Sequence, residues 1–158
     1  MDSYSTEIFD NYSIQSVKGD CDRIGNAAIY AYLYPTFMIN RYGPVCDTNY
    51  VVPISKDKCA VIFDFYFDHN DKVVNEQFIK DSIVSSDKTQ VEDVQVSESV
   101  QKGLHSSVYN VGRYAKDVEE GEHHFHRLLY YDYLKACDNN DNSNIDSFCS
   151  LETDNLSW

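Results

Sequence analysis

The sequence predicts an α+β domain in which an antiparallel sheet precedes a long helix. Two observations support this class. β-rich runs fill residues 4–67, and beyond residue 72 the apolar side chains recur at helical spacing instead of at every second position. The chain has 158 residues, 42% of them hydrophobic and 14% aromatic, which is typical of one folded domain with a substantial core.

The first strands are predicted before residue 36. Residues 4–17 carry spaced apolar side chains and predict one or two short strands, and residues 18–26 predict a polar, glycine-containing turn. Residues 27–35 are rich in Tyr, Ile and Leu. They predict a buried strand that ends at Pro35.

A β-hairpin is predicted next. Two β-rich runs, residues 49–54 and 59–67, flank four polar residues, SKDK. In the second run the apolar side chains alternate with others, which is typical of a strand with one apolar face: Val61, Phe63, Phe65 and Phe67.

Two helices and a tail are predicted for the second half of the chain. Apolar residues recur at helical spacing over residues 74–100, in two pieces interrupted near residues 85–89, and Gly103 ends this segment. Residues 123–134 predict a shorter helix. Residues 137–158 are poor in hydrophobic side chains and rich in Asn and Asp, so they predict a disordered tail.

Charge and cysteine content disfavour several classes of function. A net charge of −13 argues against nucleic acid and anionic membranes as partners, because both call for basic patches. The charge is compatible with a cationic substrate, although acidity has other causes, of which solubility is the commonest. The cysteines are odd in number and widely spaced, so they predict neither a disulfide framework nor a zinc site: Cys21, Cys46, Cys59, Cys137 and Cys149.

The sequence predicts a cytoplasmic protein. No apolar run reaches the length of a membrane span. Residues 1–10 have neither the basic flank and apolar core of a signal peptide nor the basic character of an organelle transit peptide. Unpaired cysteines are also typical of a reducing compartment.

Three segments share a pattern with one enzyme family. They are residues 34–49 (YPTFMINRYGPVCDTN), 89–104 (TQVEDVQVSESVQKGL) and 122–134 (EHHFHRLLYYDYL). Together they resemble the catalytic domain of Rieske-type non-haem iron oxygenases, in particular its choline monooxygenase branch. The resemblance covers roughly residues 4–134 and assigns residues 1–136 to a partial domain of this type. It implies a helix-grip fold, in which a long C-terminal helix packs across the sheet and a pocket lies between them.

Asp93 is the residue to which the resemblance assigns metal binding. In the family pattern this aspartate is the third ligand of a mononuclear Fe(II), and a carboxylate beside two imidazoles forms the facial triad of Fe(II) oxygenases. Residue spacing alone favours a different role, in which Glu92 and Asp93 are solvated helix surface and Lys88 pairs with Glu92. The longer family pattern favours Asp93 as the ligand and leaves Glu92 at the surface or beside the ligand.

Glu98 and Gln101 are predicted to lie close to the same site. They share a helix face with two valines that should turn towards the sheet, and the family pattern has Glu and Gln at these places. A buried Glu98 needs hydrogen-bonding partners, which Arg41 or Arg113 would supply. The alternative is a surface pair between Glu98 and Lys102, and the sequence favours neither.

Aromatic residues are the predicted substrate-binding groups. The substrate of choline-type members is a quaternary ammonium, whose methylated nitrogen has no N–H donor and is therefore recognised through cation–π contacts. Alternate residues of a strand point to one face, so Tyr30, Tyr32 and Tyr34 are expected to line the site, with Phe37 nearby. Packing in the core is the competing role for each of them.

Three consecutive or nearly consecutive histidines invite a metal-binding interpretation: His123, His124 and His126. Neighbouring helix residues point in different directions, and of these three only His123 and His126 share a face. The family has a similar helix remote from its iron. The favoured role is therefore packing and hydrogen bonding against the sheet.

The other parts of an oxygenase are missing from this sequence. A Rieske [2Fe–2S] cluster needs C-x-H and C-x-x-H motifs, and these are absent. So is the histidine pair that completes the family's iron site, since His69 and His105 lie elsewhere. The chain thus looks like a fragment, a truncated gene product or a degenerate copy, and we expect it to be inactive alone.

The resemblance implies a function for the complete enzyme. This is O2-dependent hydroxylation of a quaternary amine such as choline, towards betaine, with electrons from a reductase and a trimer as the homo-oligomeric state. No nucleic acid or membrane partner is expected, and no catalytic residue is assigned beyond the metal ligand. The alternative is a non-catalytic helix-grip module that binds a small molecule or serves as an interaction subunit.

Overall fold

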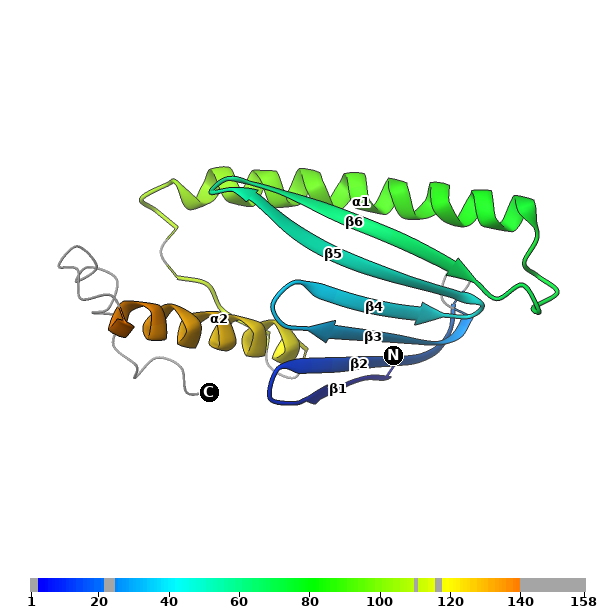
Figure 1. Cartoon of the computed structure of the whole chain (residues 1–158), viewed down its shortest axis with the longest axis horizontal. Coiled ribbons are helices and arrows are strands. Elements are labelled where there is room, and N and C mark those ends of the chain that lie inside the picture. The colour runs from blue at the N-terminus through cyan, green and yellow to red at the C-terminus, as the bar shows by residue number, and fades with distance from the viewer. Residues whose placement is uncertain (1–2, 22–24, 110, 116–117, 140–158) are drawn as a thin grey trace.

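The computed structural model describes residues 3–21, 25–109, 111–115 and 118–139. In this part of the chain, one antiparallel sheet of six strands is followed by two helices (Figure 1). The predicted α+β class, with an antiparallel sheet ahead of a long helix, is therefore confirmed. The strands are β1 (Ser3–Ile8), β2 (Tyr12–Cys21), β3 (Gly25–Leu33), β4 (Phe37–Tyr42), β5 (Val45–Ser55) and β6 (Lys58–Phe67).

Each strand pairs with the next strand along the chain. The predicted hairpin is formed by β5 and β6, although β5 starts at Val45, ahead of the predicted start at residue 49. Residues 4–17 form two strands, and β2 extends to Cys21, which shortens the predicted turn of residues 18–26. Residues 22–24 of that turn lie outside the described residues.

Strand β4 was not predicted, because the predicted strands end at Pro35 and resume only at residue 49. The turn between β3 and β4 takes only residues 34–36, and it contains a cis Tyr34–Pro35 peptide bond. Phe37–Tyr42 then pairs with β3 on one side and with β5 on the other. Gly43, at φ +52°, allows the tight turn into β5, because this backbone conformation is strained for residues with a Cβ.

Helix α1 (Glu76–Leu104) is a single helix of 29 residues, so the predicted interruption near residues 85–89 is wrong. Hydroxyl groups in this helix bond to the backbone one turn earlier without breaking it: Thr89 Oγ1 donates to the Ser85 carbonyl at 3.2 Å. At the N-terminus of α1, the side chain of Asn75 accepts a hydrogen bond from the backbone N–H of Phe78 at 3.0 Å, which caps the helix.

Helix α2 (Glu120–Asn139) is longer at both ends than the predicted helix of residues 123–134. Its last three residues belong to the segment predicted as a disordered tail, and residues 140–158 of that segment lie outside the described residues. Neither α1 nor α2 is long and apolar enough to cross a membrane.

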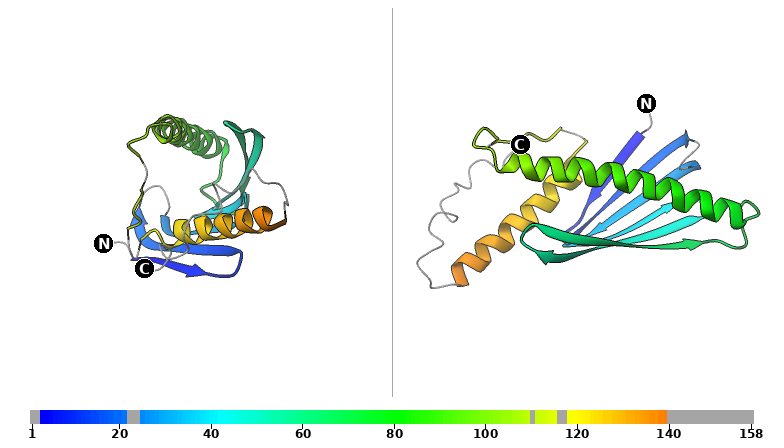
Figure 2. Two further views of the ribbon diagram at one scale, coloured as in Figure 1. Left: turned by 90° about the vertical axis from the view of Figure 1, so that its left-hand side faces the viewer. Right: turned by 90° about the horizontal axis from the view of Figure 1, so that it is seen from above.

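Both helices lie on the same side of the sheet (Figure 2). Phe67 on β6 meets Phe78 of α1 edge-on at 6.3 Å between ring centroids, and Tyr32 on β3 meets Phe125 of α2 edge-on at 5.5 Å. The register of β3 to β6 places Tyr32 and Phe67 on one face, because cross-strand partners point the same way and successive residues alternate. We call this side of the sheet the inner face.

The buried residues of the sheet lie on the inner face. They comprise three apolar and three polar side chains: Val17, Ala28, Val45, Ser13, Asn40 and Asp47. Helix α1 buries none of its own residues, and Val84, for example, is 68% exposed. The buried residues of the described chain therefore belong to the sheet, apart from His123 of α2.

Candidate functional site

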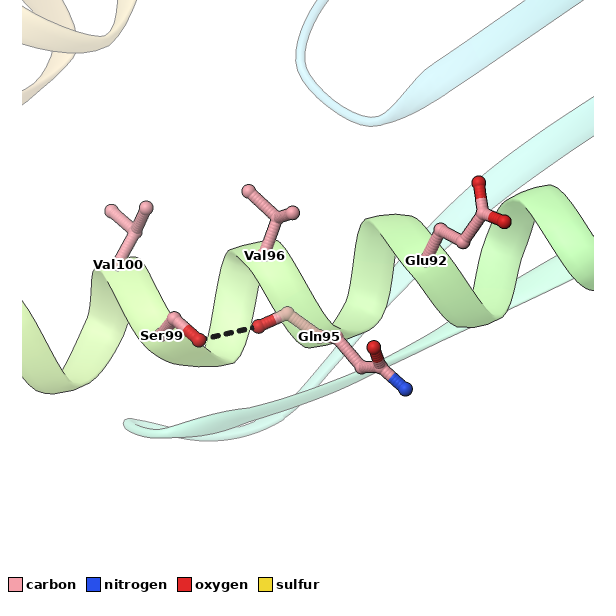
Figure 3. A pocket seen from close by; sticks show the side chains of 5 residues that line it. All are labelled: Glu92, Gln95, Val96, Ser99 and Val100. Carbon is pink, nitrogen blue, oxygen red and sulfur yellow. Dashed lines mark hydrogen bonds between the residues drawn. The ribbon is translucent and has the colours of Figure 1, made fainter.

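The side chains of Glu92 and Asp93, neighbouring acidic residues on α1, point in different directions. An open surface pocket on α1 is lined by five exposed residues of this one helix: Glu92, Gln95, Val96, Ser99 and Val100. In Figure 3, Glu92, Val96 and Val100 follow one another at four-residue intervals and point towards the side on which β3 and β4 lie. Asp93 is exposed and is not among the lining residues, because the next residue of a helix points about 100° away.

Glu98 and Gln101 are both exposed on α1. The structure therefore does not bury Glu98 against Arg41 or Arg113. In the described part of the chain, Glu98 also forms no ion pair with Lys102. The placement of Glu98 and Gln101 near a metal stays a prediction.

Tyr32 lies between the sheet and α2. Its hydroxyl donates a hydrogen bond of 2.7 Å to the carbonyl of Pro35, and its ring packs edge-on against Phe125. Desolvation by burial, and then the neighbouring Tyr34 hydroxyl, raise the pKa of Tyr32 to about 12. The ring is thus held by α2 in this structure, as expected for packing in the core.

Tyr34 connects the turn after β3 to α2. Its hydroxyl donates a hydrogen bond of 2.7 Å to Asp132 Oδ2, and its ring lies 6.1 Å from that of Phe125. Desolvation, followed by the hydrogen bond and the negative charge of Asp132, raises the pKa of Tyr34 to about 12. Tyr34 and Tyr32 are therefore brought together by a shared neighbour, Phe125.

Phe37 is not brought together with the tyrosines. In the register, Phe37 pairs with Leu33 and Tyr50, whereas Tyr32 pairs with Met38. Phe37 therefore lies on the outer face, where its ring is 6.4 Å from that of Tyr50. Tyr30 shares the inner face with Tyr32 and is half-buried.

Two of the three histidines of α2, His123 and His126, pack around Tyr114. His123 is buried, with its ring 4.9 Å from that of Tyr114, and the Tyr114 hydroxyl is hydrogen-bonded to His126 Nδ1. Burial, and then the positive charge of Arg127, lowers the pKa of His123. Nε2 of His124 is buried without a partner in the described structure. The ring contacts and the hydrogen bond of His123 and His126 are thus with Tyr114, in the segment before α2, whereas the prediction placed such contacts against the sheet.

A buried polar cluster was missed by the sequence reasoning. On the inner face, Asp47 accepts hydrogen bonds from Asn40 Nδ2 at 2.8 Å, from the Tyr42 hydroxyl at 2.8 Å and from Asn49 Nδ2. Asp47 is 5% exposed and Asn40 is 8% exposed. The available signal was Asp47 and Asn49 at alternate positions beside a run of β-rich residues, which places both on one face.

The described residues do not by themselves make an iron or cluster site. They contain no group of three or more His, Cys, Asp or Glu side chains placed to hold a metal ion. Asp93, the predicted ligand, would give one oxygen ligand, whereas a facial triad needs two imidazoles beside it. Cys46, Cys59 and Cys137 are free thiols far apart in the sequence, not a paired set of cluster ligands.

Comparison of this sequence with known protein families identifies the class to which the chain belongs. Residues 1–134 match the family described as "Ring hydroxylating alpha subunit (catalytic domain)". The chain therefore belongs to this family of oxygenase catalytic domains. No solved structure matches it significantly.

Several relatives carry the same name. The chain is 49% identical over 138 residues to "Choline monooxygenase, chloroplastic" of Arabidopsis thaliana, which is 83% of this chain and 32% of that protein. It is 40% identical over 133 residues to the protein of that name from Atriplex hortensis, covering 82% of this chain and 30% of the relative. With that of Spinacia oleracea it shares 39% over 134 residues, covering 81% and 30%. The chain thus spans about a third of the length of these relatives.

Proposed function

We propose that this chain is the C-terminal catalytic portion of a choline-monooxygenase-like Rieske oxygenase. The proposed reaction of the complete enzyme is O2-dependent hydroxylation of a quaternary amine such as choline, towards betaine. The observation that supports this is 49% identity over 83% of the chain to a relative named choline monooxygenase. Because the chain spans about a third of that relative, the activity belongs to a longer polypeptide, and we expect the chain alone to be inactive.

Asp93 is the residue that we assign to the metal. When bound, a mononuclear non-haem Fe(II) with a [2Fe–2S] Rieske cluster supplies the oxidising chemistry. Asp93 is exposed on α1 and belongs to a segment that matches the family, so its carboxylate is accessible to a metal held by histidines from outside this chain. Glu92, the next residue along the helix, is exposed and points in a different direction, so we do not assign it to the metal.

The partners and the compartment are part of the same proposal. A reductase would supply the electrons, and the homo-oligomer would be a trimer, as the family resemblance implies. The sequence predicts the cytosol, whereas the three relatives compared above are each named chloroplastic. A fluorescent fusion of the full-length protein, imaged in plant cells, decides between the two compartments.

Paired substitutions of the two neighbouring acids test the assignment. In a protein extended by the domain that carries the Rieske motifs and the histidine pair, Asp93→Asn should abolish choline-dependent O2 consumption and remove most of the mononuclear iron, because a neutral amide is a poorer ligand. Glu92→Gln is the matched control on the same helix and should lose far less of both. Equal losses in the two variants, or full activity in Asp93→Asn, would refute the assignment.

The same measurement separates the oxygenase from the alternative function. If the extended protein binds a quaternary amine but holds no iron and consumes no O2, a non-catalytic binding module is the better account. Circular dichroism of each variant shows whether a loss of activity comes from unfolding.

A further inference from the structure

The carboxylate of Asp47 is buried without a positive partner. Its three hydrogen-bond donors, from Asn40, Tyr42 and Asn49, are neutral amide and hydroxyl groups. Within the described residues Asp47 takes part in no ion pair. Arg41 is its closest basic residue in sequence, but it is exposed and alternates to the outer face. A buried negative charge held only by neutral donors is less stable than one that also has a counter-ion, so a positive charge on a ligand would be stabilised at this point.

Beside this carboxylate lies an acceptor with no donor. The Asn40 side chain must turn Nδ2 towards Asp47, because a carboxylate accepts hydrogen bonds and does not donate them. This fixes the orientation of the amide and leaves Asn40 Oδ1 buried without a partner in the described structure. A buried polar atom that lacks a partner is uncommon in folded proteins and indicates a missing donor.

Two aromatic residues extend this pair into a row across the sheet. The register places Tyr30 directly opposite Asn40, Asn40 opposite Asp47, and Asp47 opposite Phe65. Adjacent strands are about 4.8 Å apart, so the four side chains are neighbours on the inner face. Tyr30 and Phe65 are half-buried, whereas the two polar residues between them are buried.

From this arrangement we infer that Asp47 and Asn40 recognise a small organic cation that also carries a hydrogen-bond donor. The Asp47 carboxylate balances the positive charge, and Asn40 Oδ1 accepts the hydrogen of the donor group. The rings of Tyr30 and Phe65 flank the cation and offer cation–π contacts. A hydroxylated quaternary ammonium has both required features in one small molecule.

A bare metal ion fits this cluster less well than an organic cation. The cluster has one carboxylate, and both neighbouring asparagines present N–H groups to it. Hard metal cations prefer several oxygen ligands, and the asparagine N–H groups already occupy one oxygen of the single carboxylate. A ligand whose charge is spread over methyl groups needs only the negative charge and the aromatic surface.

This inference rests on the proposed function for the choice of choline as the probe. Binding of three ligands to the unmodified full chain, measured by titration calorimetry, tests it without any mutation. The ligands are choline, its neutral isostere with carbon in place of nitrogen, and its O-methyl ether, which lacks the hydroxyl donor. We expect each of the latter two to bind at least about tenfold more weakly than choline, because each loses one of the two interactions. Equal binding of choline and the neutral isostere, or no binding of choline, would overturn the inference.

Matched variants locate the site. Asp47→Asn should weaken choline by about tenfold or more while changing the neutral isostere much less. Asp64→Asn is the control, because Asp64 lies on β6, exposed, on the outer face. Should Asp47→Asn fail to fold, Asn40→Ser keeps Asp47 and should weaken choline more than its O-methyl ether. Unchanged choline affinity in the folded variants would contradict the inference.

The outcome is independent of the test of the proposed function. If cation binding depends on Asp47 but the extended protein does not oxidise choline, the binding site is supported and the proposed oxygenase function is refuted. If Asp47→Asn oxidises choline with an unchanged Michaelis constant, the oxygenase function is supported and the binding site is refuted.

Discussion

Truncation of Phe125 should release α2 from the sheet at a measurable cost in stability. Phe125 is half-buried on α2, where its ring contacts Tyr32 edge-on at 5.5 Å and Tyr34 at 6.1 Å. Replacing a fully buried Phe by Ala destabilises a protein by about 3–5 kcal/mol. Because Phe125 is half-buried, we expect Phe125→Ala to lower the free energy of unfolding by about 2 kcal/mol, including the edge-on aromatic contact.

Urea unfolding of the full chain, followed by circular dichroism, measures this loss. Tyr133→Ala is the control, because Tyr133 is also an aromatic residue of α2 and is 61% exposed. Both variants gain the same helix propensity from alanine, and the control should stay within about 0.5 kcal/mol of the unmodified chain. If the two variants lose equal stability, Phe125 does not anchor α2 and the account of Tyr32 and Tyr34 as packing residues fails.

Two further predictions concern a hydroxyl and a helix cap. Desolvation and the contact with Asp132 raise the pKa of Tyr34 from 10.0 to about 12, which favours the protonated hydroxyl in the folded chain. The stability that this hydroxyl contributes is present below pH 10.0 and is lost as the pH rises through about 12. The urea midpoint of Tyr34→Phe should therefore fall less at alkaline pH than that of the unmodified chain. If the two midpoints fall in parallel with pH, the prediction is wrong. Asn75→Ala should destabilise α1 by about 1 kcal/mol, whereas Asn75→Asp, which keeps a capping oxygen, should retain its helical signal on heating.

The elements that could be predicted from the sequence are those with a strong local pattern. The hairpin of β5 and β6 follows from alternating apolar residues in the second strand, and α1 follows from helical spacing over many turns. Strand β4 is different, because its six residues form a strand only between two partners. The predicted break near residues 85–89 was wrong, because α1 continues through them and the Thr89 hydroxyl bonds to the Ser85 carbonyl without interrupting the helix.

The parts of the site that depend on long-range contacts could not be predicted. The bond between Tyr34 and Asp132 joins residues 98 positions apart, so no local pattern shows that α2 meets these tyrosines. Alternation along β3 places Tyr30 and Tyr32 on the inner face, and Tyr34 lies in the turn after β3, but the pattern did not say that α2 would meet Tyr32 and Tyr34. Phe37 was grouped with them by proximity in sequence, and the register places it on the outer face.

The position of one carboxylate is more informative than the total charge of this chain. The sequence contains 26 acidic residues, and an excess of this kind is compatible with a cationic ligand without identifying a site for it. Among the described residues, Asp47 is the acidic side chain that is buried. The exposed carboxylates are hydrated and screened by salt, so they attract a cation only weakly. Asp47 is removed from water and lies beside an acceptor that lacks a donor, so a cation that reaches it gains an interaction that surface charges cannot offer.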